Sequence, residues 1–94
     1  MRFEERIIPP LVRLAHKLLD KGYFGFIEPI GNLLVAFQSG RWRQLPDDEQ
    51  IYWLEKSAGI FGMRALGDSW DLQDADLSQI NSLIVYELKA LRRG

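Results

Sequence analysis

The sequence predicts an all-α protein, a compact bundle of about four helices with a glycine-rich loop before the last helix. Apolar residues recur at spacings of three and four over several segments, as they do on one face of an amphipathic helix. These segments are bounded by proline, aspartate or glycine, which begin and end helices. A chain of 94 residues suits one domain, so we expect residues 1–94 to form a single helical unit.

The first expected helix runs from Leu11 to Lys21. One face carries the apolar positions Leu11, Leu14, Ala15, Leu18 and Leu19, and the other face is polar. Pro9 and Pro10 suit its first turn, or a kink that follows a short leading turn. Lys21 and Gly22 indicate its end, because a cation is favoured near the last carbonyls and glycine adopts the left-handed cap.

The stretch from Tyr23 to Leu45 allows two interpretations. Helical spacing relates Ile27, Ile30, Leu34 and Phe37, and a turn at 39–40 would end that helix. Alternatively, residues 33–38 and 41–45 could pair as a hairpin around the same turn. We favour the helix, because strict alternation of apolar and polar residues is absent before the turn and a lone hairpin is marginally stable.

The next helix is expected to begin around Pro46, which is followed by Asp47, Asp48 and Glu49. Acidic side chains favour the positive end of a helix dipole. Its core stripe is Ile51, Leu54 and Ala58, with Tyr52 or Trp53 on the flank.

Residues 58–70 hold three glycines among large apolar side chains, and we expect them to form the longest irregular stretch of the protein. The last helix should open at Asp74–Leu77 and end at Arg92 and Arg93. It has the most regular apolar stripe in the chain, formed by Leu77, Ile80, Ile84, Leu88 and Leu91.

Composition argues against several classes of protein. The net charge of −1 disfavours electrostatic binding to nucleic acid or to anionic membranes. Cysteine is absent, so no disulfide, thiolate zinc site or thiol nucleophile is available. Residues 1–6 lack the pattern of a signal peptide, and the longest apolar run, Tyr23–Phe37, is too interrupted to span a bilayer. We expect a soluble cytoplasmic protein.

The chemistry-bearing residues form no recognisable catalytic set. The acidic series Asp68, Asp71, Asp74 and Asp76 lacks the spacing of a calcium loop, and helix capping and solvation explain it better. The single histidine, His16, falls on the polar face of the first helix without a predicted nucleophile beside it. We therefore expect no enzyme activity, no metal and no cofactor.

We place a partner-binding site on two clusters that follow helix ends, Arg41, Trp42 and Arg43 together with Trp70 and Asp71. Tryptophan and arginine are enriched among residues that dominate protein interfaces. An alternative is that Trp42 packs at the edge of the core while the arginines extend into solvent. Basic residues beside an aromatic could also hold a nucleic acid strand. If Trp42 belongs to the surface site, Trp42→Ala should weaken partner capture but spare stability, whereas Ile84→Ala should lower stability first.

Parts of the chain resemble small uncharacterised bacterial helical proteins of the toxin-immunity type. The resembling segments are 11–22, 36–42 and 59–63, with Leu66 and Asp68. Such proteins bind and block a dedicated protein partner, so the resemblance implies a toxin or effector as the target and no catalytic residue.

The function that we predict is therefore that of a small non-catalytic protein-binding module, an inhibitor or immunity protein. The alternative is a structural subunit that acts as a homodimer or as part of a larger assembly, because apolar surface in a small domain needs cover. A third alternative, a nucleic-acid-associated accessory protein, is disfavoured by the charge balance.

Overall fold

The structure is a computed structural model that describes residues 2–61 and 74–93. Within these residues every regular element is helical: α1 (Phe3–Lys21), the short 3-10 helix η1 (Phe24–Phe26), α2 (Ile27–Gln38), α3 (Arg41–Gln44), α4 (Asp47–Phe61) and α6 (Ala75–Arg93). The all-α prediction is confirmed. The hairpin alternative for Tyr23–Leu45 is wrong, because this region forms η1, α2 and α3. None of the helices in the described part of the chain combines the length and apolarity that crossing a bilayer requires.

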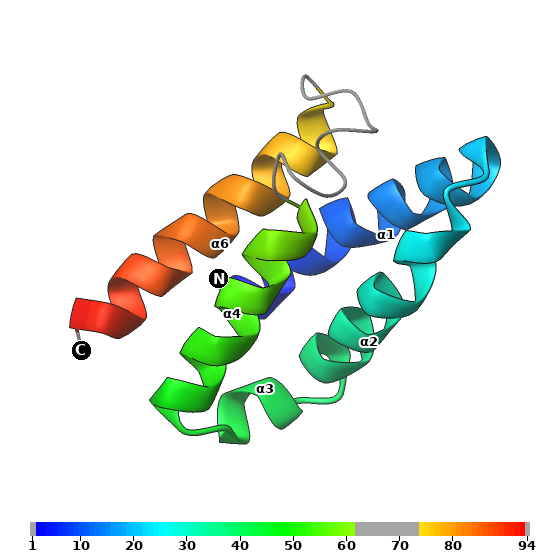
Figure 1. The fold of residues 1–94 in the computed structure, drawn as a ribbon. Coiled ribbons are helices and arrows are strands. Elements are labelled where there is room, and N and C mark those ends of the chain that lie inside the picture. The colour runs from blue at the N-terminus through cyan, green and yellow to red at the C-terminus, as the bar shows by residue number, and fades with distance from the viewer. Residues whose placement is uncertain (1, 62–73, 94) are drawn as a thin grey trace.

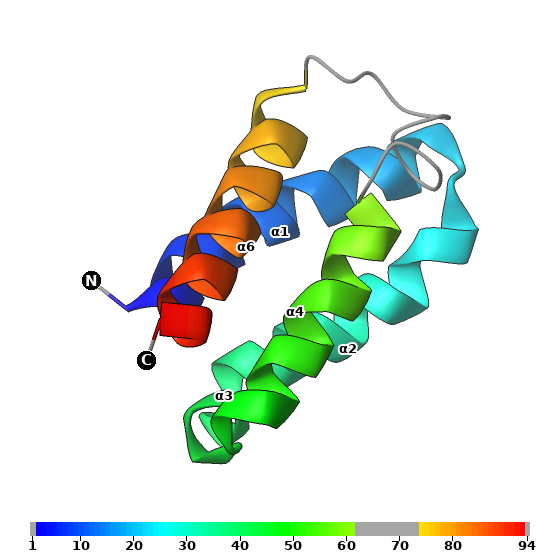
Figure 2. The ribbon, with the colours of Figure 1, turned by 60° about the vertical axis from the view of Figure 1, so that its left-hand side comes forward.

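The long helices alternate in direction along the bundle (Figures 1 and 2). Helix α1 packs against α2 and α6, and α6 also packs against α4. Helices α2 and α4 are joined through α3 at one end of the bundle, but they approach each other less closely than the other neighbouring pairs do. Among the described residues, the edge between α2 and α4 is therefore more open than the rest of the four-helix arrangement.

Helix α1 begins at Phe3, well before the predicted start at Leu11. Phe3 and Ile7 extend the apolar stripe by two more turns, and both are buried. Pro9 and Pro10 consequently lie inside the helix, where each lacks the N–H of a regular helical hydrogen bond. Burial of the two extra apolar side chains offsets part of this loss, since each contributes about 1.5–3 kcal/mol.

Both predicted glycine ends are confirmed. Gly22 follows α1 with φ 80°, and Gly40 precedes α3 with φ 79°. After α1 the N–H of Tyr23 donates to the carbonyl of Leu18 at 2.9 Å, and the N–H of Gly22 donates to that of Leu19 at 3.2 Å. This is the paired hydrogen bonding of a glycine-terminated helix.

Helix α4 starts at Asp47, as predicted, but it continues through Phe61. The first residues of the predicted irregular stretch, 58–61, are therefore helical. Burial of the Phe61 side chain accounts for the extension, because it outweighs the modest cost of Gly59 inside a helix. The rest of that predicted stretch, residues 62–70, lies outside the described residues.

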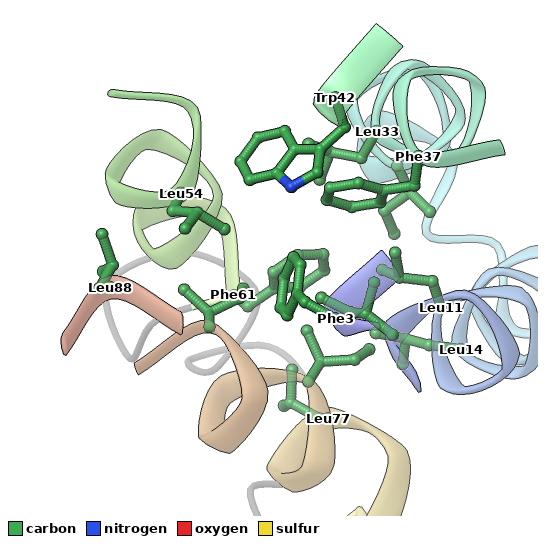
Figure 3. Close-up of a cluster of buried hydrophobic side chains, with 14 of the residues drawn as sticks. Phe3, Leu11, Leu14, Leu33, Phe37, Trp42, Leu54, Phe61, Leu77 and Leu88 are labelled. Carbon is green, nitrogen blue, oxygen red and sulfur yellow. The ribbon is translucent and has the colours of Figure 1, made fainter. Parts of the chain in front are cut away.

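The core draws side chains from all of the described α-helices (Figure 3). The predicted stripe of α6 is confirmed, with Leu77, Ile80, Ile84 and Leu88 buried and Leu91 partly buried. On α4, Leu54 is fully buried, while Ile51 and Ala58 are partly buried against the core.

Candidate functional site

Trp42, expected at a partner-binding surface, lies in the core instead. Its side chain is 1% exposed. Its ring centroid is 5.3 Å from that of Phe37, in an edge-to-face arrangement, and 6.0 Å from that of Phe3. The placement of Trp42 in a surface site is therefore corrected: helix α3 turns the indole inward, where packing against aromatic rings is more favourable than exposure to water.

The backbone around Trp42 is fixed by a buried side chain of α4. Gln50 donates from Nε2 to the carbonyl of Trp42 at 3.1 Å and to the carbonyl of Leu45 at 2.9 Å. The indole Nε1 has no hydrogen-bond acceptor among the described residues. Ring packing and the Gln50 hydrogen bonds therefore hold α3 in place, without help from the polar atom of the indole.

The two arginines that flank Trp42 differ in their surroundings. Arg43 forms a two-pronged ion pair with Glu4 of α1, with Nε 2.7 Å from Oε2 and Nη2 2.9 Å from Oε1. These hydrogen bonds raise the pKa of the Arg43 guanidinium. Arg41 is exposed at the start of α3. Trp70 and Asp71, the other half of the predicted site, lie outside the described residues.

Two members of the predicted acidic series have structural roles. Asp74 caps α6, because its Oδ1 accepts the N–H groups of Asp76 and Leu77 at 2.9 and 3.0 Å. Asp76 is buried and pairs with Arg13 and Lys17 of α1 at 2.9 and 2.8 Å. Helix capping and ion pairing therefore account for both residues, while Asp68 and Asp71 lie outside the described residues.

The ion pairs of Asp76 predict a dependence of stability on pH. Hydrogen bonds from Lys17 and then Arg13 lower the pKa of the Asp76 carboxyl, although burial opposes them. Stability from this group is therefore present above the unfolded pKa, about 4, and is lost as the pH falls through the lower folded pKa. We expect Asp76→Asn to reduce the free energy of unfolding by about 1–2 kcal/mol at neutral pH, with a smaller deficit in acid.

Urea unfolding of the wild type and Asp76→Asn at pH values from neutral to strongly acidic measures this effect. Asp20→Asn, at an exposed position of α1, is the matched control. If Asp76→Asn lowers the free energy of unfolding by the same amount at every pH, the role assigned to the ion pairs is contradicted.

The structure contains a cleft that the sequence did not predict, between α2 and α4 at the open edge of the bundle. Its volume is about 410 Å³, and it is lined by Gly25, Glu28, Pro29, Asn32, Trp53, Lys56, Ser57 and Ile60. At the α3 end of this pair, Trp42 lies between Phe37 of α2 and Leu54 of α4 (Figure 3), so the two helices do not close on each other there. Nearer the other end, Gly25 has no side chain and that of Ser57 is short, so these two residues fill little of the hollow.

One rim of the cleft is an aromatic and cationic cluster on α4. Trp53 is 38% exposed, and the Lys56 ammonium lies 5.3 Å from the centroid of its ring. Tyr52 packs edge to face on Trp53 at 6.2 Å and is itself exposed. A cation over an indole face is a favourable pairing that also keeps the ring from full hydration.

The opposite rim carries Glu28 of α2, an exposed carboxylate. Within residues 2–61 and 74–93, neither Glu28 nor Lys56 forms an ion pair. The cleft thus has an anion on one side and a cation on the other, and Pro29 and Ile60 also belong to its lining.

The described residues that line the cleft combine apolar surface with four polar side chains, those of Glu28, Asn32, Lys56 and Ser57. The hydroxyl of Ser57 donates to the carbonyl of Trp53 at 2.7 Å, within α4 itself. What the cleft offers is apolar surface, an aromatic ring and two opposite charges.

Sequence reasoning placed Trp53 only on the flank of a helix and did not consider Glu28 and Lys56 together. A tryptophan followed three residues later by a lysine, on the side of an expected helix away from its core stripe, is the signal that could have found the α4 rim. Comparisons with known protein families, with curated proteins and with solved structures find no match for this chain.

Proposed function

We propose that this protein is a small non-catalytic protein-binding module that uses the cleft between α2 and α4. The observation that carries the proposal is the half-exposed Trp53, held under Lys56 at the edge of an apolar hollow. Tryptophan contributes more binding free energy than most residues when a partner excludes water around it. Opposite charges beside apolar lining residues also suit the general anatomy of protein interfaces.

The resemblance to toxin-immunity proteins implies action by occupation of a partner, and a module of this kind needs a surface rather than a reactive centre. The lining of the cleft supports the same view, because Pro29, Trp53 and Ile60 give it apolar surface that a protein partner could cover.

Site-specific photocrosslinking in cells that produce the protein tests the proposal. A benzophenone amino acid replaces Asn32, an exposed residue of the cleft, and in a matched protein it replaces Ser78, an exposed residue of α6. We expect a light-dependent protein adduct from position 32 that is absent from position 78 and is reduced by Trp53→Ser. Mass spectrometry identifies the adduct. Identical adducts from both positions, or none from position 32, would overturn the proposed function.

A further inference from the structure

We infer that the protein partner of the cleft is a second copy of this chain, related to the first by a two-fold axis that runs along the cleft. The inference rests on the proposed function, since it names the occupant of the same surface. In this arrangement the α2 rim of each copy lies against the α4 rim of the other, and Glu28 of each copy lies opposite Lys56 of its partner.

The charges of the two rims are self-complementary under this symmetry. Helices α2 and α4 run in opposite directions (Figure 1). The cleft is lined from one side by residues between 25 and 32, which belong to η1 and α2, and from the other by residues between 53 and 60 of α4. Glu28 and Lys56 occupy corresponding places near the middle of these two segments. A two-fold rotation about an axis parallel to the helices exchanges the two rims. Each Glu28 carboxylate then meets a Lys56 ammonium of the other copy, twice in each dimer, and neither group forms an ion pair with another described residue of its own chain. An unrelated partner would need to carry both charges independently.

The apolar groups are complementary in the same arrangement. Trp53 of each copy would rest on the α2 rim of the other, near Pro29 and Asn32, and become covered. Each bundle would thereby close its open edge with the helices of its partner. The net charge of −1 places little long-range repulsion between two copies.

Charge reversal tests the inference sharply, because each single variant should dimerise poorly alone, whereas the two variants should pair with each other when mixed. Glu28→Lys places two lysines opposite each other at both contacts, and Lys56→Glu places two glutamates there. We expect each variant alone to raise the dissociation constant of the dimer by about tenfold or more. An equimolar mixture of the two should form a heterodimer, since every contact then joins opposite charges. The double variant E28K/K56E should dimerise like the wild type.

Sedimentation equilibrium over a range of concentrations gives the dissociation constants. Native mass spectrometry distinguishes the heterodimer by mass when one of the two mixed variants is uniformly labelled with ¹⁵N. Asp20→Lys and Lys89→Glu make the same charge reversals at exposed positions of α1 and α6 and should leave dimerisation unchanged. Circular dichroism shows whether each variant retains its helical content.

Several outcomes would overturn the inference. These are a wild type that is monomeric at every concentration, a dimer that resists both reversals, and a mixture that does not pair. A monomeric wild type whose position 32 still crosslinks to a different protein would leave the proposed function standing. Failure of both the dimer and the crosslink would remove both proposals.

Discussion

Replacement of Trp42 with alanine is expected to lower the free energy of unfolding by about 3–5 kcal/mol, as much as Ile84→Ala or more. The indole is 1% exposed and packs on Phe3 of α1 and Phe37 of α2. Its removal would leave a large cavity where three helices meet α3, and buried cavities of this kind do not collapse fully. A surface location of Trp42 would instead predict that Trp42→Ala spares stability.

Urea unfolding followed by circular dichroism measures the effect. Tyr52→Ala is the control, because it removes an aromatic side chain that is 60% exposed and should cost much less stability. If Trp42→Ala and Tyr52→Ala shift the unfolding midpoint equally, the packing role assigned to Trp42 is wrong.

The sequence was sufficient for the fold class because its apolar spacing is consistent over long segments. Leu77, Ile80, Ile84 and Leu88 repeat on one face without interruption, and all are buried. Helix ends were also predictable where one residue has a distinctive conformational preference, as at Gly22 and Gly40 with their positive φ.

Boundaries failed where tertiary packing outweighs local preference. Prolines normally begin helices, so the pair at 9–10 suggested a start near Leu11. Burial of Phe3 and Ile7 extends the helix through them. Burial of Phe61 likewise extends α4 past Gly59. The free energy gained by burying these side chains depends on the neighbouring helices, so it cannot be read from the local sequence.

The candidate site was harder to predict because it depends on which neighbouring helices pack less closely against each other than the rest do. Arg41, Trp42 and Arg43 are adjacent in sequence, yet the short helix α3 sends the indole inward and directs Arg43 to Glu4. The cleft instead joins residues from α2 and α4 that are separated along the chain, with Glu28 on one side and Lys56 on the other. No local pattern links such residues.

The Glu4–Arg43 ion pair should give an asymmetric response to the loss of either partner. The Glu4 side chain is 9% exposed, whereas that of Arg43 is 41% exposed. Arg43→Leu would leave a buried carboxylate without its counter-ion, so we expect a loss of about 2–3 kcal/mol. Glu4→Gln would leave a guanidinium that water can reach, so we expect a loss of only about 1 kcal/mol.

A double-mutant cycle on the free energy of unfolding measures the coupling between the two side chains. The variant E4Q/R43L should be more stable than the sum of the single losses implies, because it contains no unpaired buried charge. Arg41→Leu, the same substitution at the neighbouring exposed arginine, should cost little. Equal losses for Arg43→Leu and Arg41→Leu would mean that the ion pair does not secure α3 to α1. The asymmetry would show that this basic triplet stabilises the fold through Arg43, and that the surface available to a partner lies elsewhere on the bundle.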